Sequence, residues 1–295
     1  MDFDTITKTD LDLLEVYLRG SISAGSPLYR DVIDAMNYSL LSGGKRVRAL
    51  FCMEVCRALG GTVEAALPFA AAVEMVHAYS LIHDDLPCMD DDDLRRGKPS
   101  NHKVFGEANA LLAGDGLLTH AFYTLATSDT GARQGLLAVK LLAEAAGCHG
   151  MIGGQVIDLG WENRDTPAEV LEQMHRLKTG ALIAVAAQLG AVAAGHTGDE
   201  ELEILGDFAR KVGLAFQIVD DILDATGDEQ KLGKPIGSDA QQGKTTFITL
   251  YGLERSQEAV RQLTSDAIEK LYQVVAPESG KYLASLCWRL TDREN

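Results

Sequence analysis

Six aspartates lie within ten residues of this sequence, at positions 84 to 93 in the segment HDDLPCMDDDDLRRGK. Arg95 and Arg96 follow directly, and the apolar run LPFAAAVEMV precedes the segment. An isolated run of aspartates is most simply a solvated acidic loop. Here the apolar run anchors the acidic segment against a core, and the two arginines suit an anionic ligand. Because carboxylate oxygens are hard ligands, the segment predicts a site for Mg²⁺ or Mn²⁺ rather than for zinc.

A second carboxylate cluster lies far downstream in FQIVDDILD, which contains Asp220, Asp221 and Asp224. On a helix, Asp220 and Asp224 are about one turn apart, with Cβ atoms about 5–6 Å from each other. Their neighbours are apolar, so carboxylates at this point need partners. Two acidic clusters that faced each other would repel, and divalent cations with a polyanion between them would remove the repulsion. Together the clusters predict a metal-dependent site for a phosphate-bearing ligand.

Cationic residues that suit such a ligand occur in short motifs. The motif GGKRVR places Lys45, Arg46 and Arg48 after two glycines at an expected helix start, where phosphate binds favourably. It does not match the GxxxxGK[ST] phosphate loop, and taken alone it is as consistent with solvated surface. Lys178 falls within an apolar helix, where an unpaired ammonium is costly. A bound anion is therefore the simplest partner for Lys178.

The elements that must position these residues are helices. Segments such as VRALFCMEVCRAL and ELEILGDFARKVGLAFQIVDDIL repeat apolar residues every three to four positions. The helix that begins near Ala65 should end near Asp85, because Pro87 cannot donate a helical hydrogen bond and the residue before it resists helical geometry. Other prolines, Pro68 and Pro167 among them, are expected at element boundaries. We predict one all-α domain over residues 1–295.

The bulk composition argues against several classes of protein. A net charge of −16 and a pI of about 4.8 argue against a general nucleic-acid binder. Five cysteines, with no CxxC pair, argue against a disulfide framework or a zinc site and favour a reduced cytosolic compartment. No apolar run reaches the roughly 20 residues of a membrane span, and the N-terminus has no apolar signal core. We therefore expect a cytoplasmic protein without a membrane span and without a nucleic-acid partner.

The ordered motifs resemble those of bacterial-type farnesyl diphosphate synthases, which are short-chain trans-prenyltransferases of the polyprenyl synthase family. The motifs are GGKRVR, HAYSLIHDDLPCMDDDDLRRGKPSNH, GGQVIDL, KTGAL, FQIVDDILD, LGKPIGSD and GKTT. Each is modest alone, but the ordered set is specific and spans nearly the whole chain. The resemblance implies an isoprenoid synthase fold, a large helical bundle around a deep central cavity, and usually a homodimer. It also implies Mg²⁺, two or three ions per site, with Mn²⁺ as a substitute.

Carried over position by position, the resemblance assigns metal ligands at both acidic clusters. Asp84 and Asp90 are the main ligands of the first cluster, with Asp85 beside them; Asp220 leads the second, supported by Asp221 and Asp224. The six-residue spacing from Asp84 to Asp90 corresponds to 240° on an ideal helix, so the two cannot share a face there. A break at Pro87 is the physical means by which they would converge.

The resemblance divides the other site residues between two diphosphates. The positions that match the isopentenyl diphosphate site are Lys45, Arg48, His77 and Arg96. The positions that match the allylic diphosphate site are Arg95, Lys178, Thr179, Gln217, Lys234 and Lys244. Arg95, Lys178 and Thr179 are expected to assist the chemical step. A lone histidine on a buried helix is usually a core residue, but His77 lies two turns before Asp84 on the same face, which favours ligand contact.

The implied reaction is head-to-tail condensation of isopentenyl diphosphate with dimethylallyl or geranyl diphosphate. Tyr79, five residues before Asp84, is the expected floor of the prenyl cavity, with Ser80 next to it. The expected product is farnesyl diphosphate (C15), with geranylgeranyl (C20) or geranyl (C10) diphosphate as alternatives. A terpene cyclase would typically lack GGKRVR and the second full DDxxD, and a non-catalytic synthase subunit would usually have lost an aspartate motif. Two departures from the family pattern are Ala49, where proline is frequent, and a C-terminal tail without a clear basic cluster.

Overall fold

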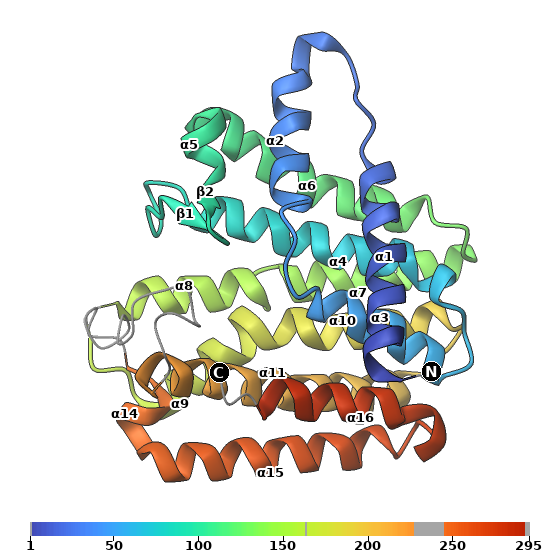
Figure 1. The fold of residues 1–295 in the computed structure, drawn as a ribbon, viewed down its shortest axis with the longest axis vertical. Helices are drawn as coiled ribbons and strands as arrows, with labels where there is room; N and C mark the ends of the chain where they lie inside the picture. Colours follow the sequence, from blue (N-terminus) through green and yellow to red (C-terminus); the bar gives the residue numbers. More distant parts are fainter. Residues whose placement is uncertain (1, 163, 227–244, 293–295) are drawn as a thin grey trace. The chain divides into compact units, whose positions relative to one another are not determined.

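The computed structural model describes residues 2–162, 164–226 and 245–292, which are almost entirely helical (Figure 1). The all-α prediction is confirmed, since the strands in this part of the chain are only β1 (Leu94–Arg95) and β2 (Lys98–Pro99). The chain divides into two compact units, Met1–Val139 with Val192–Gly195 and Lys140–Ala191 with His196–Asn295. The prediction of a single domain around a central cavity concerns how these units meet, and it stays a prediction.

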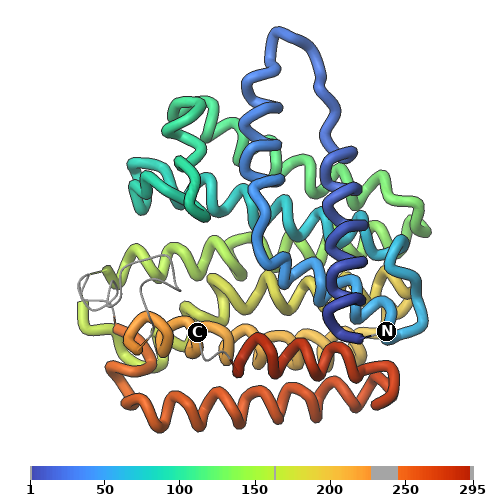
Figure 2. Tube along the Cα trace, viewed as in Figure 1, coloured from blue at the N-terminus to red at the C-terminus, as the bar shows by residue number. Residues whose placement is uncertain are grey.

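Unit 1 is built around helix α4. Its elements are α1 (Phe3–Ser21), η1 (Pro27–Tyr29), α2 (Arg30–Leu40), α3 (Val47–Ala58), α4 (Val63–Asp84), the β1–β2 hairpin, α5 (Asn101–Phe105), α6 (Glu107–Ala126) and the first half of α7 (Ala132–Ala146). Helix α4 packs against α1, α2, α3 and α6, and Figure 2 shows α4 and α6 running alongside each other. Neighbours on so many sides explain why α4 is apolar around most of its circumference.

Unit 2 is built around helix α11. Its elements are the second half of α7, α8 (Met151–Trp161), α9 (Ala168–His175), the π-helical turn η2 (Arg176–Gly180), α10 (Ala181–Ala193), α11 (Asp199–Thr226), α14 (Phe247–Tyr251), α15 (Leu253–Leu271) and α16 (Pro277–Thr291). Helix α11 packs against η2, α14, α15 and α16. Its second half contributes Ile218, Val219 and Leu223 to a core cluster with Leu171 and Phe247.

The boundaries of α4 have local causes. Thr62 caps the N-terminus, where its hydroxyl accepts a hydrogen bond from the Ala65 amide at 3.3 Å. The helix ends at Asp84 with Asp85 as its C-cap, as the position of Pro87 predicts. The boundary prediction is wrong for Pro68, which lies inside α4, whereas Pro167 caps α9.

Three helical stretches of the described chain are long and apolar enough to cross a membrane by length and composition, namely Val63–Asp84, Ala132–Trp161 and Ala168–Ala193. The expectation that the chain has no membrane span therefore cannot rest on the lengths of its apolar runs. In Val63–Asp84 the apolar side chains contribute to the core, since 72% of the most apolar 18-residue stretch of this helix is buried within the protein.

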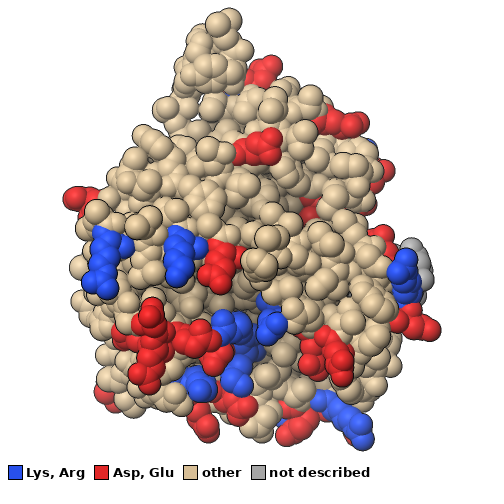
Figure 3. Space-filling model, turned by 180° about the vertical axis from the view of Figure 1, so that it is seen from behind, with Lys and Arg blue, Asp and Glu red and all other residues tan. Residues whose placement is uncertain are grey.

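Charged side chains are mixed on the surface. The face in Figure 3 carries acidic and basic groups side by side, with broad uncharged areas between them. Nucleic-acid binding relies on clustered cations that neutralise many phosphates. The face in Figure 3 also shows several basic side chains close together with acidic ones beside them, and the expectation of no nucleic-acid partner stays a prediction from the acidic composition.

Candidate active site

The acidic segment folds back on itself at the end of α4. The Asp90 amide donates a hydrogen bond to the Asp84 carbonyl at 2.8 Å, and the Met89 amide donates to the Leu86 carbonyl at 2.8 Å. Asp91 then takes a left-handed conformation with φ of 50°, which aspartate tolerates better than most residues. The turn brings the backbone of Asp90 next to that of Asp84, as the break at Pro87 predicts.

Asp85 holds the hairpin that carries the two arginines. Its carboxylate is 2% exposed and accepts hydrogen bonds from Nε of Arg95 at 2.8 Å and from Nη2 at 2.5 Å. Arg95 Nη2 also reaches Asp92 at 2.8 Å. Burial raises the pKa of Asp85, and the hydrogen bonds and charge of Arg95 oppose the rise. Asp85 is thus bound to Arg95, a contact that the sequence-based ligand assignment did not anticipate.

The acidic turn suits a magnesium ion that brings its own anionic ligand. Within the described residues no three His, Cys, Asp or Glu side chains are gathered to hold an ion by themselves. Mg²⁺ is usually bound through one or two carboxylates together with substrate phosphates and water, rather than by a cage of protein ligands. Asp84 and Asp90, whose backbones meet in the turn, would supply carboxylates for this mode of binding.

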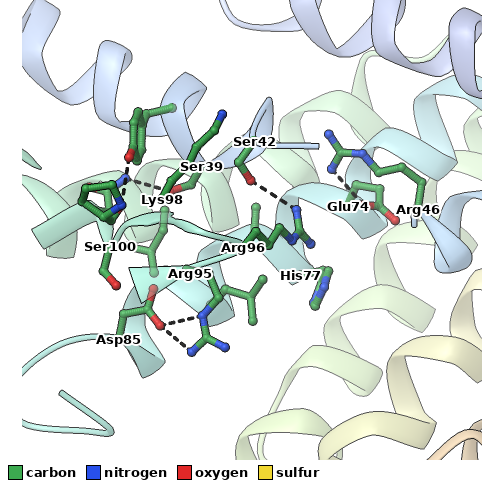
Figure 4. Close-up of a pocket in the computed structure, with 16 residues that line it drawn as sticks. Ser39, Ser42, Arg46, Glu74, His77, Asp85, Arg95, Arg96, Lys98 and Ser100 are labelled. Atoms are coloured by element: carbon green, nitrogen blue, oxygen red, sulfur yellow. Dashed lines mark hydrogen bonds and ion pairs between the residues drawn. The ribbon is translucent and has the colours of Figure 1, made fainter. Parts of the chain in front are cut away.

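A group of cationic side chains surrounds His77 in unit 1 (Figure 4). Burial lowers the pKa of His77 well below its ordinary value, and the charges of Arg48, Arg96, Arg46 and Arg95 lower it further. Burial and the charge of Arg96 also lower the pKa of Arg48, whereas Glu74 raises it. Arg48 Nε is buried and has no hydrogen-bond partner among the described residues. Cationic groups so close together, one of them with a buried and unpartnered donor, favour a bound anion.

Within GGKRVR, Arg46 has a structural role. Its guanidinium is buried and donates to Glu74 at 3.1 Å, to Glu15 at 3.0 Å and to the Leu40 carbonyl at 2.6 Å. Glu74 also accepts the Ala49 amide at 3.3 Å. Arg46 is the N-cap of α3 with φ of 48°. This network fixes the start of α3, on which Arg48 sits, while Lys45 lies just before it and is exposed.

In unit 2, Lys178 already has a protein partner. Its Nζ lies 2.5 Å from Oδ2 of Asp158, so the inference that a bound anion is its simplest partner is wrong for the protein alone. Asp158 belongs to GGQVIDL, and its place in that motif was the available signal. The two residues meet because α8 approaches η2 closely at Gly154, where an added Cβ would strike the backbone of Leu177 and Lys178.

Lys178 and Thr179 lie on the π-helical turn η2. Such turns shift the backbone hydrogen-bond pattern by one residue and often mark functional sites. Gly180 follows Thr179 and is buried against α11, close to Gly213. The irregular turn is consistent with a special role for the Lys178 carbonyl and the Thr179 hydroxyl, which regular periodicity does not reveal.

Helix α11 presents Gln217, Asp220 and Asp224 at successive turns. Asp224 is 3% exposed, whereas Gln217 and Asp220 are half-buried. Asp221 has a different contact, since its Oδ2 accepts the amide of Phe247 at 2.9 Å and so ties the start of α14 to α11. The two aspartate clusters lie in different units, and their meeting at one ligand stays a prediction. Lys234 and Lys244 lie outside the described residues.

The residues expected to set chain length lie on α4 within unit 1. Tyr79 is buried, its hydroxyl has no hydrogen-bond partner among the described residues, and its ring meets that of His83 edge-to-face at 5.7 Å. Burial and then the charge of Asp84 raise the pKa of Tyr79 to about 12. His83 in turn contacts the Leu111 carbonyl of α6 at 3.0 Å, and the Ser80 hydroxyl donates to the His77 carbonyl at 2.9 Å.

Comparisons with known proteins show the family to which the chain belongs. The polyprenyl synthetase family model matches residues 30–277. Geranylgeranyl pyrophosphate synthase 7, chloroplastic, of Arabidopsis thaliana is 49% identical over 259 residues, 86% of this chain and 74% of that protein. Farnesyl diphosphate synthase of Escherichia coli (strain K12) is 48% identical over 246 residues, 82% of each chain.

A solved structure extends the likeness to the fold. The geranyltransferase from Helicobacter pylori, complexed with magnesium and isoprenyl diphosphate, matches with a TM-score of 0.86 at 32% identity over 99% of both chains. Both the sequence match and the structural match cover most of this chain. The chain therefore belongs to the polyprenyl synthetase family of prenyltransferases and has its all-α isoprenoid synthase fold.

Proposed function

We propose that this protein condenses isopentenyl diphosphate with dimethylallyl and then geranyl diphosphate, in a magnesium-dependent reaction whose main product is farnesyl diphosphate. The observation that carries the proposal is in unit 1, where an acidic turn that suits magnesium lies on the same helix as His77, within a group of arginines that suits a diphosphate. The family match and the solved relative with magnesium and isoprenyl diphosphate support the same reaction class.

The metal ions would be held by Asp84 and Asp90 from one unit and by Asp220 and Asp224 from the other, with two or three ions per site. When bound, magnesium would stabilise the negative charge that develops on the departing allylic diphosphate. Asp85 would act through Arg95, which it orients at 2.8 Å, and Asp221 would act by tying α14 to α11. Direct contact with the metal ions would therefore come from Asp84, Asp90, Asp220 and Asp224.

The chain would hold its two substrates with different cations. Lys45, Arg48, His77 and Arg96 would bind isopentenyl diphosphate. The allylic diphosphate would be bound by Arg95, Lys178, Thr179, Gln217, Lys234 and Lys244. Lys178 would exchange its contact with Asp158 for one with the diphosphate, or share its three N–H donors between them.

The proposed reaction consists of three bond changes. The C1–O bond of the allylic substrate breaks, and its electron pair leaves with the diphosphate. The double bond of isopentenyl diphosphate attacks C1, a C–C bond forms, and a proton then leaves from C2 to the departed diphosphate. The Lys178 carbonyl and Thr179 hydroxyl would stabilise the allylic cation through their dipoles, and exclusion of water would protect it.

The C15 product rests on Tyr79, a bulky side chain that is buried one to two turns before Asp84. The alternative product is geranylgeranyl diphosphate, which the name of the 49% identical Arabidopsis relative favours. A C10 product remains a further alternative. A buried aromatic ring at this level of α4 limits the length of a prenyl chain that extends below the acidic turn.

A homodimer and a cytoplasmic location complete the proposal. Helix α6 exposes Leu111, Leu112 and Tyr123 at 47%, 52% and 60%, an apolar surface of the kind that protein partners cover. The cytoplasmic location is supported by the cysteine pattern, since Cys52, Cys56, Cys88, Cys148 and Cys287 are all unpaired. Light scattering of the purified chain tests the dimer directly.

The reaction class is tested by measuring diphosphate release from isopentenyl diphosphate and geranyl diphosphate with Mg²⁺. Release should require both substrates, should match the loss of isopentenyl diphosphate one for one, and should stop on addition of EDTA. Release of diphosphate from geranyl diphosphate alone, at the rate seen with both substrates, would instead favour a terpene cyclase.

A further inference from the structure

The guanidinium of Arg96 occupies the space that a side chain at position 44 would need. Gly44 has φ of 121°, and a Cβ built on it would lie 2.7 Å from Cζ, 2.8 Å from Nη1 and 2.9 Å from Nη2 of Arg96. Arg96 comes from the β1–β2 turn, about fifty residues away in the sequence. Because Gly44 has no side chain, its loop and the β1–β2 turn that carries Arg96 can approach each other closely here.

Arg96 is held there by the same loop. Its Nη1 donates to the Gly43 carbonyl and to the Ser42 hydroxyl, the latter at 3.2 Å (Figure 4). Both of these hydrogen bonds use Nη1, and a guanidinium has five N–H donors. Within the described chain the donors of Nε and Nη2 thus remain for another acceptor.

The ring of His77 lies beside this guanidinium and defines where an acceptor would bind. Burial lowers the pKa of His77, and the charges of Arg48 and Arg96 lower it further. Burial also lowers the pKa of Arg96, where the charge of Arg46 adds to the shift and that of Glu74 opposes it. The cost of burial and the charge of Arg46 both favour movement of the Arg96 side chain into solvent. The Gly44 recess and its two acceptors oppose that movement.

We propose that Gly44 is a positioning residue for the isopentenyl diphosphate site: it provides the recess in which the guanidinium of Arg96 is seated, with the donors of Nε and Nη2 available to the ligand. The assignment rests on the proposed function of Arg96. It gives the second glycine of GGKRVR a role distinct from close approach of the backbone to phosphate. An alanine at position 44 would strain the backbone at this φ and would in addition displace Arg96, because the atoms that its Cβ meets are the far end of a flexible side chain.

A double-mutant cycle tests the assignment. Arg96→Ala should raise the KM for isopentenyl diphosphate by about 10- to 100-fold, as expected for one charge-assisted contact. Gly44→Ala should raise the same KM by about tenfold and change the KM for geranyl diphosphate by less than about twofold, since it acts through Arg96. In the double variant, Gly44→Ala should add less than about twofold to the effect of Arg96→Ala.

Gly43→Ala is the matched control for backbone strain. Gly43 also has positive φ, at 82°, but a Cβ there meets nothing within 4 Å. Its effect on the KM for isopentenyl diphosphate should be smaller than that of Gly44→Ala, because it keeps the carbonyl that accepts from Arg96 Nη1 and its Cβ does not meet Arg96. Equal effects of Gly43→Ala and Gly44→Ala, or a Gly44→Ala effect that multiplies fully with Arg96→Ala, would overturn the assignment.

The same cycle in urea unfolding of the unliganded protein separates this inference from the proposed function. If Gly44 and Arg96 are in contact, their effects on the unfolding midpoint should be non-additive even if the wild type transfers no prenyl group. Additive midpoints would contradict the contact whatever the activity. Should Gly44→Ala fail to fold, Ser42→Ala replaces it in the cycle, because it removes one of the two acceptors of Nη1. Full multiplication of Ser42→Ala with Arg96→Ala would then overturn the seating of Arg96.

Discussion

At the level of single residues, the proposed reaction depends on two aspartates that belong to different units. Asp84→Ala or Asp220→Ala should lower kcat by at least about 100- to 1,000-fold, the range seen when one group that stabilises developing charge is removed. Circular dichroism should be unchanged, because the hydrogen bond that closes the acidic turn accepts at the Asp84 backbone carbonyl.

The matched control for this pair is Asp93→Ala, in the same acidic run. Asp93 forms an exposed ion pair with Lys103 at 2.6 Å, and such pairs contribute little. Asp93→Ala should retain most of the activity. Near-wild-type turnover of Asp84→Ala with Mg²⁺ would show that the ligand assignment is wrong.

The two diphosphate sites should separate by mutation. Lys45→Ala and Arg48→Ala should raise the KM for isopentenyl diphosphate about 10- to 100-fold, whereas Lys178→Ala should act chiefly on the allylic substrate. Asp158→Asn should also act on the allylic substrate alone, because it removes the partner that lies 2.5 Å from Lys178. Steady-state kinetics with each substrate varied in turn measures this, and equal effects of all four variants on both substrates would refute the division.

Two histidines should make stability fall in mild acid. Burial lowers the pKa of His77 and lowers that of His175 to about 4, from an ordinary value of 6.5. Below pH 6.5 the unfolded chain binds protons that the folded protein does not, so the free energy of unfolding decreases as the pH falls. The slope is up to about 1.4 kcal/mol per pH unit for each histidine, and the contribution of His175 levels off below pH 4.

Urea unfolding between pH 7 and pH 4 measures this slope. His175→Gln should make it shallower, and the exposed His149→Gln serves as the control. A slope that is the same in wild type and His175→Gln would contradict a buried neutral imidazole at position 175.

At the scale of elements, the junction between α8 and η2 should be sensitive to small added volume. Gly154→Ala should destabilise unit 2 and impair the allylic site, because the new Cβ meets the backbone of Lys178 and neither element can yield cheaply. Gly160→Ala, in the same helix, meets nothing within 4 Å and is the control. Thermal unfolding and the KM for geranyl diphosphate measure the effect. A Gly154→Ala protein as stable as Gly160→Ala would mean that the close approach has no energetic consequence.

Much of the helical structure can be predicted from the sequence, and the exceptions have physical causes. Apolar periodicity predicts α4 and α11, and Pro87 predicts where α4 ends, because proline acts locally on the backbone. Pro68 does not end α4, since packing on several sides of the helix outweighs one lost hydrogen bond. The left-handed backbone of Arg46 and the π-helical turn at Lys178 depend on partners distant in the sequence, such as Glu74 and Gly154.

The same distinction, between local sequence signals and contacts distant in the sequence, applies to the candidate site. Residue type and spacing identify Asp84, Asp90 and the cations of GGKRVR as candidates. Spacing does not reveal that Arg46 is used internally, or that Asp85 and Asp158 are partners of Arg95 and Lys178, because these pairings are set by tertiary contacts.

At the scale of the whole molecule, product length should follow the volume at position 79. Tyr79→Ala should yield products longer than C15, because removing the buried ring opens room for another isoprene unit. Tyr79→Phe should leave the product at C15, since it keeps the ring and removes only a hydroxyl for which the described part of the chain offers no hydrogen-bond partner. Ser80→Phe should shorten the product. A clean C15 product from Tyr79→Ala would place the floor of the cavity elsewhere.

The most direct measurement is chromatography of the products formed by the wild type from labelled isopentenyl diphosphate with dimethylallyl, geranyl or farnesyl diphosphate as primer. With Mg²⁺, the first two primers should give labelled farnesyl diphosphate, and the third should give little product, because the chain already reaches Tyr79. Geranylgeranyl diphosphate as the main product from every primer would contradict the C15 assignment. No labelled product of any length, from a folded protein with Mg²⁺, would contradict prenyl transfer itself.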